Sequence, residues 1–503
     1  MIAFLKNFFT YDEHAPLIFT NGMFWIFFGF VLLGFSYTYK SIKTRNLFLM
    51  VCSLFFYYKS SGIYILILLF SICIDYIIGN ELYKTKDKFR KKLLIVACLT
   101  VNLSLLGFFK YAHFITEQIN LLFGTNLYPI NFMTAFYNSV SGEKVDIAAI
   151  FLPVGISFYT FQSLSYAIDI YRGTIKPIDK FLDYAFFVSF FPQLVAGPIV
   201  RASEFLPQVS KPYSLSQEDF TKAIYLIIVG LAKKIVISDF ISVNFVDRVF
   251  TTPNAFTGFE NLMAIYGYTL QIYCDFSGYT DIAIGVALLL GFRLSLNFNK
   301  PYTAQNITDF WRRWHISLSR WLKDYLYISL GGNRNGTIAT YFNLFITMVL
   351  GGLWHGAHVK FIIWGALHGL ALGVHKFWIK QVKLPESKAY NCAAGILTFN
   401  FVAFCWIFFR ADNLNTVSMM LTQIMDNFQF MLIPAIISGY TKVFSIILIG
   451  FAIHFTPSRY SDIVREKFNQ YGLFKKAMVI TLLVLFIYQF KTSELQPFIY
   501  FQF

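Results

Sequence analysis

Residues 93–111 read Leu-Leu-Ile-Val-Ala-Cys-Leu-Thr-Val-Asn-Leu-Ser-Leu-Leu-Gly-Phe-Phe-Lys-Tyr, an almost unbroken apolar run. A helix needs about 20 such residues to cross the hydrocarbon core of a bilayer. A basic cluster stands directly before the run and comprises Lys84, Lys86, Lys88, Arg90, Lys91 and Lys92. Basic residues gather on the cytoplasmic side of membrane helices. The pattern therefore predicts a transmembrane helix that begins at the cytoplasmic face.

Similar apolar runs recur along the whole chain. Hydrophobic residues make up 56% of the sequence and charged residues only 14%, whereas soluble domains carry about 25% charged residues. We therefore predict an all-α, polytopic transmembrane helical bundle with about 11–13 spans, some of them re-entrant or interfacial. The candidate runs are residues 17–39, 47–58, 62–78, 93–111, 147–170, 184–200, 220–240, 261–274, 279–292, 341–353, 361–377, 392–409, 431–455 and 477–490.

The distribution of basic residues predicts the orientation. Lys40, Lys43 and Arg45 follow the first run, which has no basic leader before it and is expected to be retained as a helix. Residues 40–45 and 84–92 should both be cytoplasmic, with a hairpin of two short runs between them. The N-terminus and residues 112–146 should then lie outside the cytoplasm.

The chain is expected to form one membrane domain over residues 1–503. Residues 15–146 supply N-terminal helices, 147–380 a motif-bearing core and 381–503 C-terminal helices. No Pro/Gly/Ser-rich linker or internal repeat divides it. The net charge of +15 comes from lysines and arginines in short loops, so it indicates membrane topology and not nucleic-acid binding. None of the six cysteines forms a C-x-x-C pair, which argues against disulfides or a thiolate metal site.

Polar residues concentrate first in residues 309–325. On a helix, one arc of this segment is apolar and the opposite side is basic, with His315 at the edge of the arc and facing inward. This pattern predicts an amphipathic helix with tryptophan anchors at the membrane surface. A plain anchor helix with a structural histidine remains the alternative. The apolar arc comprises Trp311, Trp314, Leu318, Trp321, Leu322 and Tyr325, and the basic side comprises Arg312, Arg313, Arg320 and Lys323.

The second concentration is Gly351-Gly352-Leu353-Trp354-His355-Gly356-Ala357-His358, which interrupts two apolar runs. Broken helices at membrane depth occur where they are buried in protein or line a cavity, and an ionisable residue there is a functional candidate. Histidine is suited to general base catalysis near neutral pH. His355 is therefore a catalytic candidate, with a buried structural histidine as the alternative reading.

Other chemistries are poorly supported. His368 and His375 lie seven residues apart, a spacing that with His355 or His358 would suggest a metal site. No acidic residue lies between Asp324 and Glu386, so we expect no metal. There is no G-x-S-x-G motif for a serine nucleophile. Nothing in the sequence marks a cysteine such as Cys274 or Cys405 as a nucleophile.

These motifs resemble those of the membrane-bound O-acyltransferase family, in particular its alginate O-acetyltransferase-like branch. The resemblance departs from the branch at Ser329, where proline is expected, and at His358-Val359, where a small residue and tryptophan are expected. The second departure suggests a different acyl donor or partner. The matching segments are residues 152–162, 191–199, 273–279, 310–319, 324–328, 331–334, 351–357 and 364–369.

The resemblance implies a helical bundle around a central funnel, with catalytic His355 near its centre and His315 across from it. His355 would accept a hydroxyl proton, and His315 or backbone donors would stabilise the oxyanion. The donor substrate would be a cytoplasmic acyl thioester, either acetyl-CoA or an acyl carrier, with no bound cofactor or metal. Supporting or channel positions are Trp354, Gly356, Trp311, Trp314, Arg312, Ser317, Asp324 and Asn333.

The predicted function is O-acetyl transfer at the bacterial cytoplasmic membrane onto a cell-surface polysaccharide or onto a partner protein that relays the group. Peptidoglycan O-acetylation and teichoic-acid D-alanylation are the alternatives within the class. A glycolipid transporter or flippase would show broken helices in two corresponding halves, whereas both motifs lie in the second half. A membrane scaffold would leave the glycine-flanked His355 unexplained.

Overall fold

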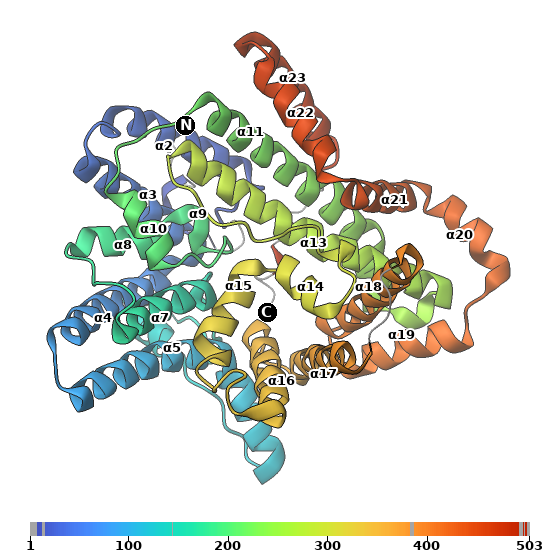
Figure 1. Ribbon diagram of the computed structural model, residues 1–503, viewed down its shortest axis with the longest axis horizontal. Coiled ribbons are helices and arrows are strands. Elements are labelled where there is room, and N and C mark those ends of the chain that lie inside the picture. The colour runs from blue at the N-terminus through green and yellow to red at the C-terminus, as the bar shows by residue number, and fades with distance from the viewer. Residues whose placement is uncertain are drawn as a thin grey trace. The chain divides into compact units, whose positions relative to one another are not determined.

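The structure is a computed structural model, and it describes residues 8–12, 16–142, 144–382, 387–491, 496 and 498–499. Helices form its regular structure, and the described residues contain no strand (Figure 1). Six helical segments are long and apolar enough to cross a membrane, or up to eight if each sharply bent pair forms one span. The predicted polytopic helical bundle is confirmed.

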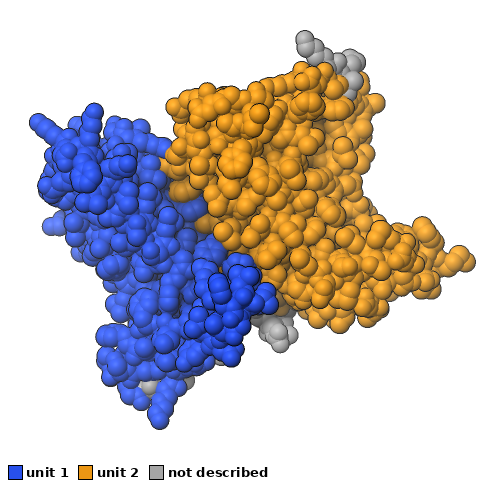
Figure 2. Space-filling view, turned by 90° about the horizontal axis from the view of Figure 1, so that it is seen from below, with its two compact units in different colours: residues 1–214, 290–294 blue, residues 215–289, 295–503 orange. Residues whose placement is uncertain are grey.

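The chain divides into two compact units (Figure 2). The first comprises Met1–Ser214 and Leu290–Leu294. Buried phenylalanines fill part of its core, among them Phe190, Phe205 and Phe292, whose rings lie 5.1 to 5.4 Å apart. Its helices are α2 (Gly22–Thr38), α3 (Ile42–Ser61), η1 (Gly62–Tyr64), α4 (Ile65–Lys84), α5 (Lys88–Phe123), α6 (Phe132–Ser141), α7 (Ile156–Arg172), α8 (Phe181–Ser189), α9 (Phe191–Leu194) and α10 (Ala202–Val209).

The second unit, Leu215–Leu289 with Ser295–Phe503, contains both histidine motifs. Its helices are α11 (Gln217–Leu231), η2 (Ala232–Asp239), η3 (Ser242–Val246), α12 (Asp247–Thr251), η4 (Pro253–Ala255), α13 (Gly258–Leu289), η5 (Pro301–Thr303), α14 (Ile307–Arg313), α15 (Ile316–Trp321), η6 (Leu322–Tyr327), α16 (Gly336–His355), α17 (Val359–Gln381), α18 (Lys388–Arg410), α19 (Leu414–Asp426), η7 (Phe430–Leu432), α20 (Ile433–Gly439), α21 (Thr441–Phe455), α22 (Ser458–Gln470) and α23 (Leu473–Tyr488).

Several expected spans are shorter helices, which is why fewer segments than 11–13 are long enough to cross. The run 147–170 is helical only from Ile156, and the run 184–200 divides into α8 and α9. The run 431–455 divides into α20 and α21. In contrast, Ile42–Lys84 is a 43-residue helical stretch, longer than one crossing requires. Gly62, with φ of 55°, departs from helical geometry inside it, between the two runs that were predicted to form a hairpin.

Helix α13 corrects one expectation directly. The runs 261–274 and 279–292 were expected as separate segments, but α13 continues through Ser277 and Gly278. Gly278 serves close packing and does not break the helix. A Cβ atom there would lie 2.8 Å from the carbonyl oxygen of Gly230 in α11, and a Cβ atom on Gly230 would lie 2.5 Å from the carbonyl oxygen of Gly278. Two small residues therefore let the backbones of α11 and α13 approach each other.

Buried charges fix α13 in this unit. The Nζ atom of Lys234 lies 2.6 Å from carboxylate oxygens of both Asp239 and Asp275. The other oxygen of Asp275 accepts a hydrogen bond of 2.9 Å from the backbone N–H of Ile499. All three side chains are buried, so each carboxylate needs the shared ammonium as its partner. Asp275 belongs to the motif 273–279, and this cluster holds the motif in place.

Candidate active site

The segment 309–325 forms three short elements instead of the single predicted helix. Helix α14 ends at Arg313, α15 begins at Ile316, and the chain continues as the π-helical η6. His315 lies at the break with φ of 42°, in the left-handed region. Left-handed geometry is uncommon for a residue other than glycine, although histidine adopts it more often than most. The break turns His315 out of the helical register and into the protein.

The apolar arc of this segment is buried, as predicted, but it is buried in protein. The Nε1 atom of Trp311 donates a hydrogen bond of 3.3 Å to Nδ1 of His368 in α17. The rings of Trp314 and Trp406, the latter in α18, lie 4.9 Å apart. Thr308 and His375 form a further hydrogen bond of 2.8 Å between α14 and α17. The tryptophans therefore fix α14 against two other helices, so the predicted role as lipid anchors is wrong for Trp311 and Trp314.

His315 is fully buried and held by Asn297. Its Nδ1 atom lies 3.1 Å from Oδ1 of Asn297, and the same oxygen accepts hydrogen bonds from the backbone N–H and the hydroxyl of Ser317. Since Oδ1 can only accept, the proton of neutral His315 belongs on Nδ1. Burial lowers the pKa of His315 to about 3, so the ring is neutral at physiological pH. The Nε2 atom of His315 is then a hydrogen-bond acceptor.

This tautomer bears on the expected role of His315. An oxyanion must receive hydrogen bonds from donors, whereas an unprotonated Nε2 can only accept one. The geometry therefore argues against His315 as the group that stabilises the oxyanion. It favours a role in which Nε2 orients a hydroxyl group by accepting its hydrogen bond.

His355 is the last residue of α16, and its side chain is 3% exposed. The next residue, Gly356, is extended with φ of −166° and ψ of 152°. A Cβ atom on Gly356 would lie 2.0 Å from the ring of Phe361, so any larger residue would have to displace that ring at the first turn of α17. The helix breaks directly after His355, as predicted. The imidazole is enclosed by the rings of Trp354, Trp364 and Phe409, at centroid distances of 5.0, 5.1 and 5.2 Å.

Trp354 contacts both histidines. Its ring centroid lies 6.2 Å from that of His315 and 5.0 Å from that of His355. Two buried imidazoles from separate motifs thus share one aromatic neighbour. His315 is also packed against Phe276 of the motif 273–279, at 4.7 Å. The tertiary structure therefore gathers three of the predicted motifs around one buried cluster.

The glycines of the second motif bring α16 and α17 together. A Cβ atom on Gly352 would lie 2.2 Å from the carbonyl oxygen of Phe361, and one on Gly365 would lie 2.4 Å from that of Met348. Both contacts are with backbone, which cannot move aside as a side chain can. The close approach places Trp364 of α17 beside His355 at the end of α16.

The remaining predicted positions fall into two groups. Trp311, Trp314 and Ser317 are buried and hold the segment around His315. Arg312 and Asn333 are exposed, and Asp324 is half-buried in η6. None of these last three belongs to the ring cluster around the histidines. They lay in matching motifs, but a motif does not reveal which of its side chains point inward.

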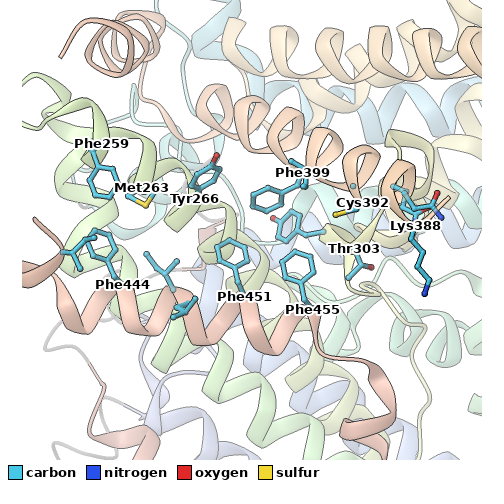
Figure 3. A pocket seen from close by; sticks show the side chains of 18 residues that line it. Phe259, Met263, Tyr266, Thr303, Lys388, Cys392, Phe399, Phe444, Phe451 and Phe455 are labelled. Atoms are coloured by element: carbon cyan, nitrogen blue, oxygen red, sulfur yellow. The ribbon is translucent and has the colours of Figure 1, made fainter. Parts of the chain in front are cut away.

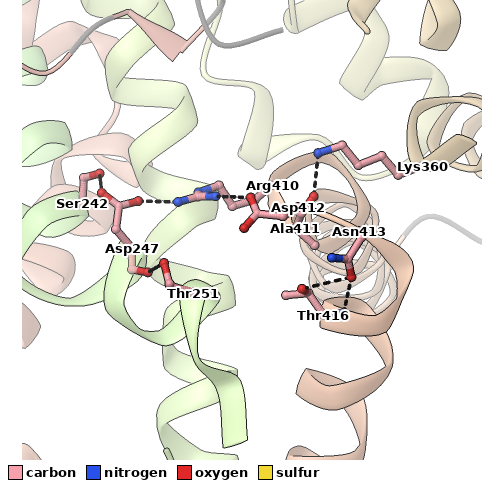
Figure 4. A network of polar contacts seen from close by, with 9 residues as sticks. All are labelled: Ser242, Asp247, Thr251, Lys360, Arg410, Ala411, Asp412, Asn413 and Thr416. Carbon is pink, nitrogen blue, oxygen red and sulfur yellow. Dashed lines mark hydrogen bonds and ion pairs between the residues drawn. The ribbon is translucent and has the colours of Figure 1, made fainter. Parts of the chain in front are cut away.

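His358, a departure from the branch pattern, caps α17. Its Nδ1 accepts a hydrogen bond of 3.2 Å from the backbone N–H of Lys360. Lys360 in turn donates to the carbonyl oxygen of Ala411 at 2.6 Å, next to Arg410, which pairs with Asp247 at 2.7 Å (Figure 4). This polar network joins the start of α17 to the end of α18. Phe409, whose ring contacts that of His355, directly precedes Arg410 of this network.

Asn297 and Trp364 are the residues that sequence reasoning missed or undervalued. Asn297 lies in the loop before η5, outside every quoted motif, and its only signal is a polar residue between Leu296 and Phe298. Trp364 stood inside a quoted motif without an assigned role. Its ring is 1% exposed, and its Nε1 has no hydrogen-bond partner among the residues described. An indole N–H can only donate, so this atom is a buried donor beside His355.

Comparison with known proteins adds an independent line of support. Residues 175–418 match the membrane-bound O-acyltransferase family. The chain is 40% identical to a probable alginate O-acetylase of Pseudomonas syringae pv. tomato, over 80% of this chain and 74% of that protein. It is 37% identical to a peptidoglycan O-acetyltransferase of Helicobacter pylori, over 80% and 78%. It is 32% identical to a teichoic acid D-alanyltransferase of Bacillus subtilis, over 51% and 68%.

Proposed function

The chain belongs to the membrane-bound O-acyltransferase family, and we propose that its acyl transfer takes place at the cluster of His315, Trp354 and His355. The protein is a multi-pass membrane O-acyltransferase. The observation that carries the proposal is that Trp354 contacts both imidazoles, at 6.2 and 5.0 Å. Histidines from two separate motifs thereby border one buried site.

In the proposed reaction, His355 is the general base. It takes the proton of the acceptor hydroxyl while the hydroxyl oxygen forms a bond to the thioester carbonyl carbon. The resulting tetrahedral oxyanion collapses, the carbon–sulfur bond breaks, and the thiolate leaves. The proton held by His355 passes to that sulfur. The products are an ester and a free thiol, and His355 returns to its neutral form.

His315 and Trp364 have complementary roles in this proposal. Asn297 keeps the His315 proton on Nδ1, so Nε2 accepts a hydrogen bond from a second hydroxyl of the acceptor and thereby orients the reacting hydroxyl, whose own proton goes to His355. The Nε1–H of Trp364 beside His355 donates to the carbonyl oxygen as negative charge develops. The backbone N–H groups after the helix break at Gly356 are further donors of this kind.

The substrates are proposed by class. We expect an acyl thioester, acetyl-CoA or an acyl carrier, to reach the site from the cytoplasm, because a thioester is already activated for transfer. The acceptor is a hydroxyl of a cell-surface polysaccharide or of a relay partner protein at the bacterial cytoplasmic membrane. The relatives named for O-acetyl transfer align with 80% of this chain, and the D-alanyltransferase with 51%. This difference favours an acetyl group.

The test is acyl transfer by purified variants in detergent, normalised to folded protein. His355→Ala should lose at least ~10²-fold in turnover, the low end of general-base effects. Trp364→Phe should lose about 10²–10³-fold, as expected for an oxyanion donor. Trp406→Phe is the matched control, because Trp406 stacks on Trp364 at 5.8 Å in the same cluster, and it should retain activity. Near-normal turnover of folded His355→Ala would refute the mechanism.

A further inference from the structure

A second site lies apart from the histidines, in a groove of about 1000 Å³ between α13, α18 and α21 (Figure 3). Apolar side chains, five of them phenylalanines, line most of it, with Phe259 and Phe444 toward one end and Lys388 at the other. The groove opens to the outside of the unit, since the lining residues Ile396 and Leu448 are 60% and 71% exposed. Exposed apolar surface on a membrane protein faces lipid.

One face of α18 forms the groove wall and changes from polar to apolar along its length. Lys388, Asn391, Gly395 and Phe399 follow one another at helical spacing and all line the groove. Lys388 to Phe399 spans about 16 Å at roughly 1.5 Å per residue. The facing stretch of α21, from Phe444 to Phe455, is of equal length, and the residues with which it lines the groove are all apolar. This length matches one leaflet, about half of the ~30 Å hydrocarbon core.

The Lys388 end has the features of a membrane interface. Trp378 and Tyr390 are 45% and 40% exposed there, at the end of α17 and the start of α18. Aromatic residues of this kind are enriched at headgroup level. On the other wall, α21 ends at Phe455, and the polar helix α22 leaves it at an angle of 91°. A helix that turns this sharply and becomes polar marks the same boundary.

The charge at this end favours an anionic ligand. Lys388 forms no ion pair with a described carboxylate, and Lys376 and Lys380 stand in the last turns of the neighbouring helix α17. Basic residues at this level indicate the cytoplasmic side, where anionic lipids attract them. Two other polar groups of the wall are hydrogen-bonded within the protein. The Tyr266 hydroxyl donates to Asn400 at 2.7 Å, and the Thr303 hydroxyl donates to the carbonyl oxygen of Lys300.

We propose that this groove binds one anionic phospholipid of the cytoplasmic leaflet, with an acyl chain between α18 and α21 and its phosphate at Lys388. The ligand is bound as part of the structure and takes no part in acyl transfer. The side chain of Tyr302 lines the groove and packs against Trp314 at 6.2 Å.

Native mass spectrometry and thermal melts of the purified full-length protein test the proposal, using equal amounts of added phosphatidylglycerol and phosphatidylcholine. The wild type should retain phosphatidylglycerol preferentially and melt at a higher temperature with it. Lys388→Gln should reduce the preference about fivefold, the worth of one basic residue near an anionic surface. Lys380→Gln, a lysine at the same end that does not line the groove, should change it less.

A second variant fills the groove. Gly395→Leu can be accommodated in α18, because a Cβ atom there lies 4.0 Å from its nearest neighbour, the carbonyl oxygen of Ala304. It should reduce retention of both lipids, whereas Ala393→Leu, an exposed position outside the groove, should not. Both variants should keep acyl transfer.

The proposal is overturned if Lys388→Gln and Lys380→Gln behave alike or if Gly395→Leu retains as much lipid as Ala393→Leu. Loss of acyl transfer in folded Gly395→Leu would also overturn it, because the groove would then hold a substrate.

Discussion

The Oδ1 atom of Asn297 lies 3.1 Å from the Nδ1 atom of His315, and both side chains are fully buried. The backbone carbonyl oxygen of Asn297 also accepts a hydrogen bond of 2.9 Å from the N–H of Ile316. A residue from a preceding loop therefore caps the start of α15, holds the histidine at its left-handed position and fixes its tautomer.

Replacing Asn297 should impair catalysis. In Asn297→Leu the Nδ1–H of His315 and the N–H of Ser317 lose their acceptor, and each buried unsatisfied group costs about 1–3 kcal/mol. We expect turnover to fall about 10–100-fold, comparable to the loss when the hydrogen-bond partner of a metal-binding histidine is removed. Asn299→Leu, at an exposed position in the same loop, is the control. Equal turnover of the two variants, normalised to folded protein, would contradict the positioning role.

His315 should also affect stability through pH. Its pKa is about 3 in the folded protein and ordinarily about 6.5 in an unfolded chain. Between these values the unfolded chain binds a proton that the folded protein does not, so stability is complete above pH 6.5 and falls as pH decreases. The slope from this group is at most about 1.4 kcal/mol per pH unit. His315→Asn suits the left-handed position and should flatten the decline in melting temperature between pH 6.5 and 4.5. An unchanged slope would show that His315 is not buried in its neutral form.

The contact between α16 and α17 should be intolerant of a single methyl group. Gly352→Ala would place a Cβ atom 2.2 Å from the carbonyl oxygen of Phe361, so the helices would have to separate. We expect a loss of about 3 kcal/mol or more, within the range of severe overpacking, seen as a lower yield of monodisperse protein and a lower melting temperature. Gly373→Ala in α17 meets only the ring of Tyr341 at 3.8 Å and should be neutral or mildly stabilising. Similar behaviour of the two variants would argue against the close backbone approach.

Cysteine labelling tests the predicted orientation. Lys88 begins α5 and Ser139 lies near the end of α6, and both side chains are exposed. Ser139 is used because the side chain of its neighbour Asn138 holds a turn through hydrogen bonds with Val145. In a background without the exposed Cys73 and Cys392, an impermeant thiol reagent should label Ser139→Cys in intact cells. Lys88→Cys should react only after lysis. Labelling of Lys88→Cys but not of Ser139→Cys in intact cells would show that the topology is inverted.

The sequence by itself determined the class of the protein and the position of its motifs. Apolar runs and scarce charge require a membrane helical bundle, because neither is compatible with a water-exposed fold. Glycines on both sides of His355 marked a break at membrane depth, and the structure has the break directly after that residue. The sequence also predicted which side of residues 309–325 faces inward, because hydrophobic periodicity indicates the face that avoids water.

Only the tertiary structure decided how these pieces meet. The break at His315 contains neither glycine nor proline. It is held by hydrogen bonds that Asn297 accepts from His315 and Ser317, which periodicity within one segment cannot reveal. The same limit applies to Trp314, which looked like a lipid anchor and packs against Trp406. Burial in lipid and burial in protein produce the same apolar pattern. Which one a residue experiences depends on contacts between distant segments, and those contacts place Trp354 against both histidines.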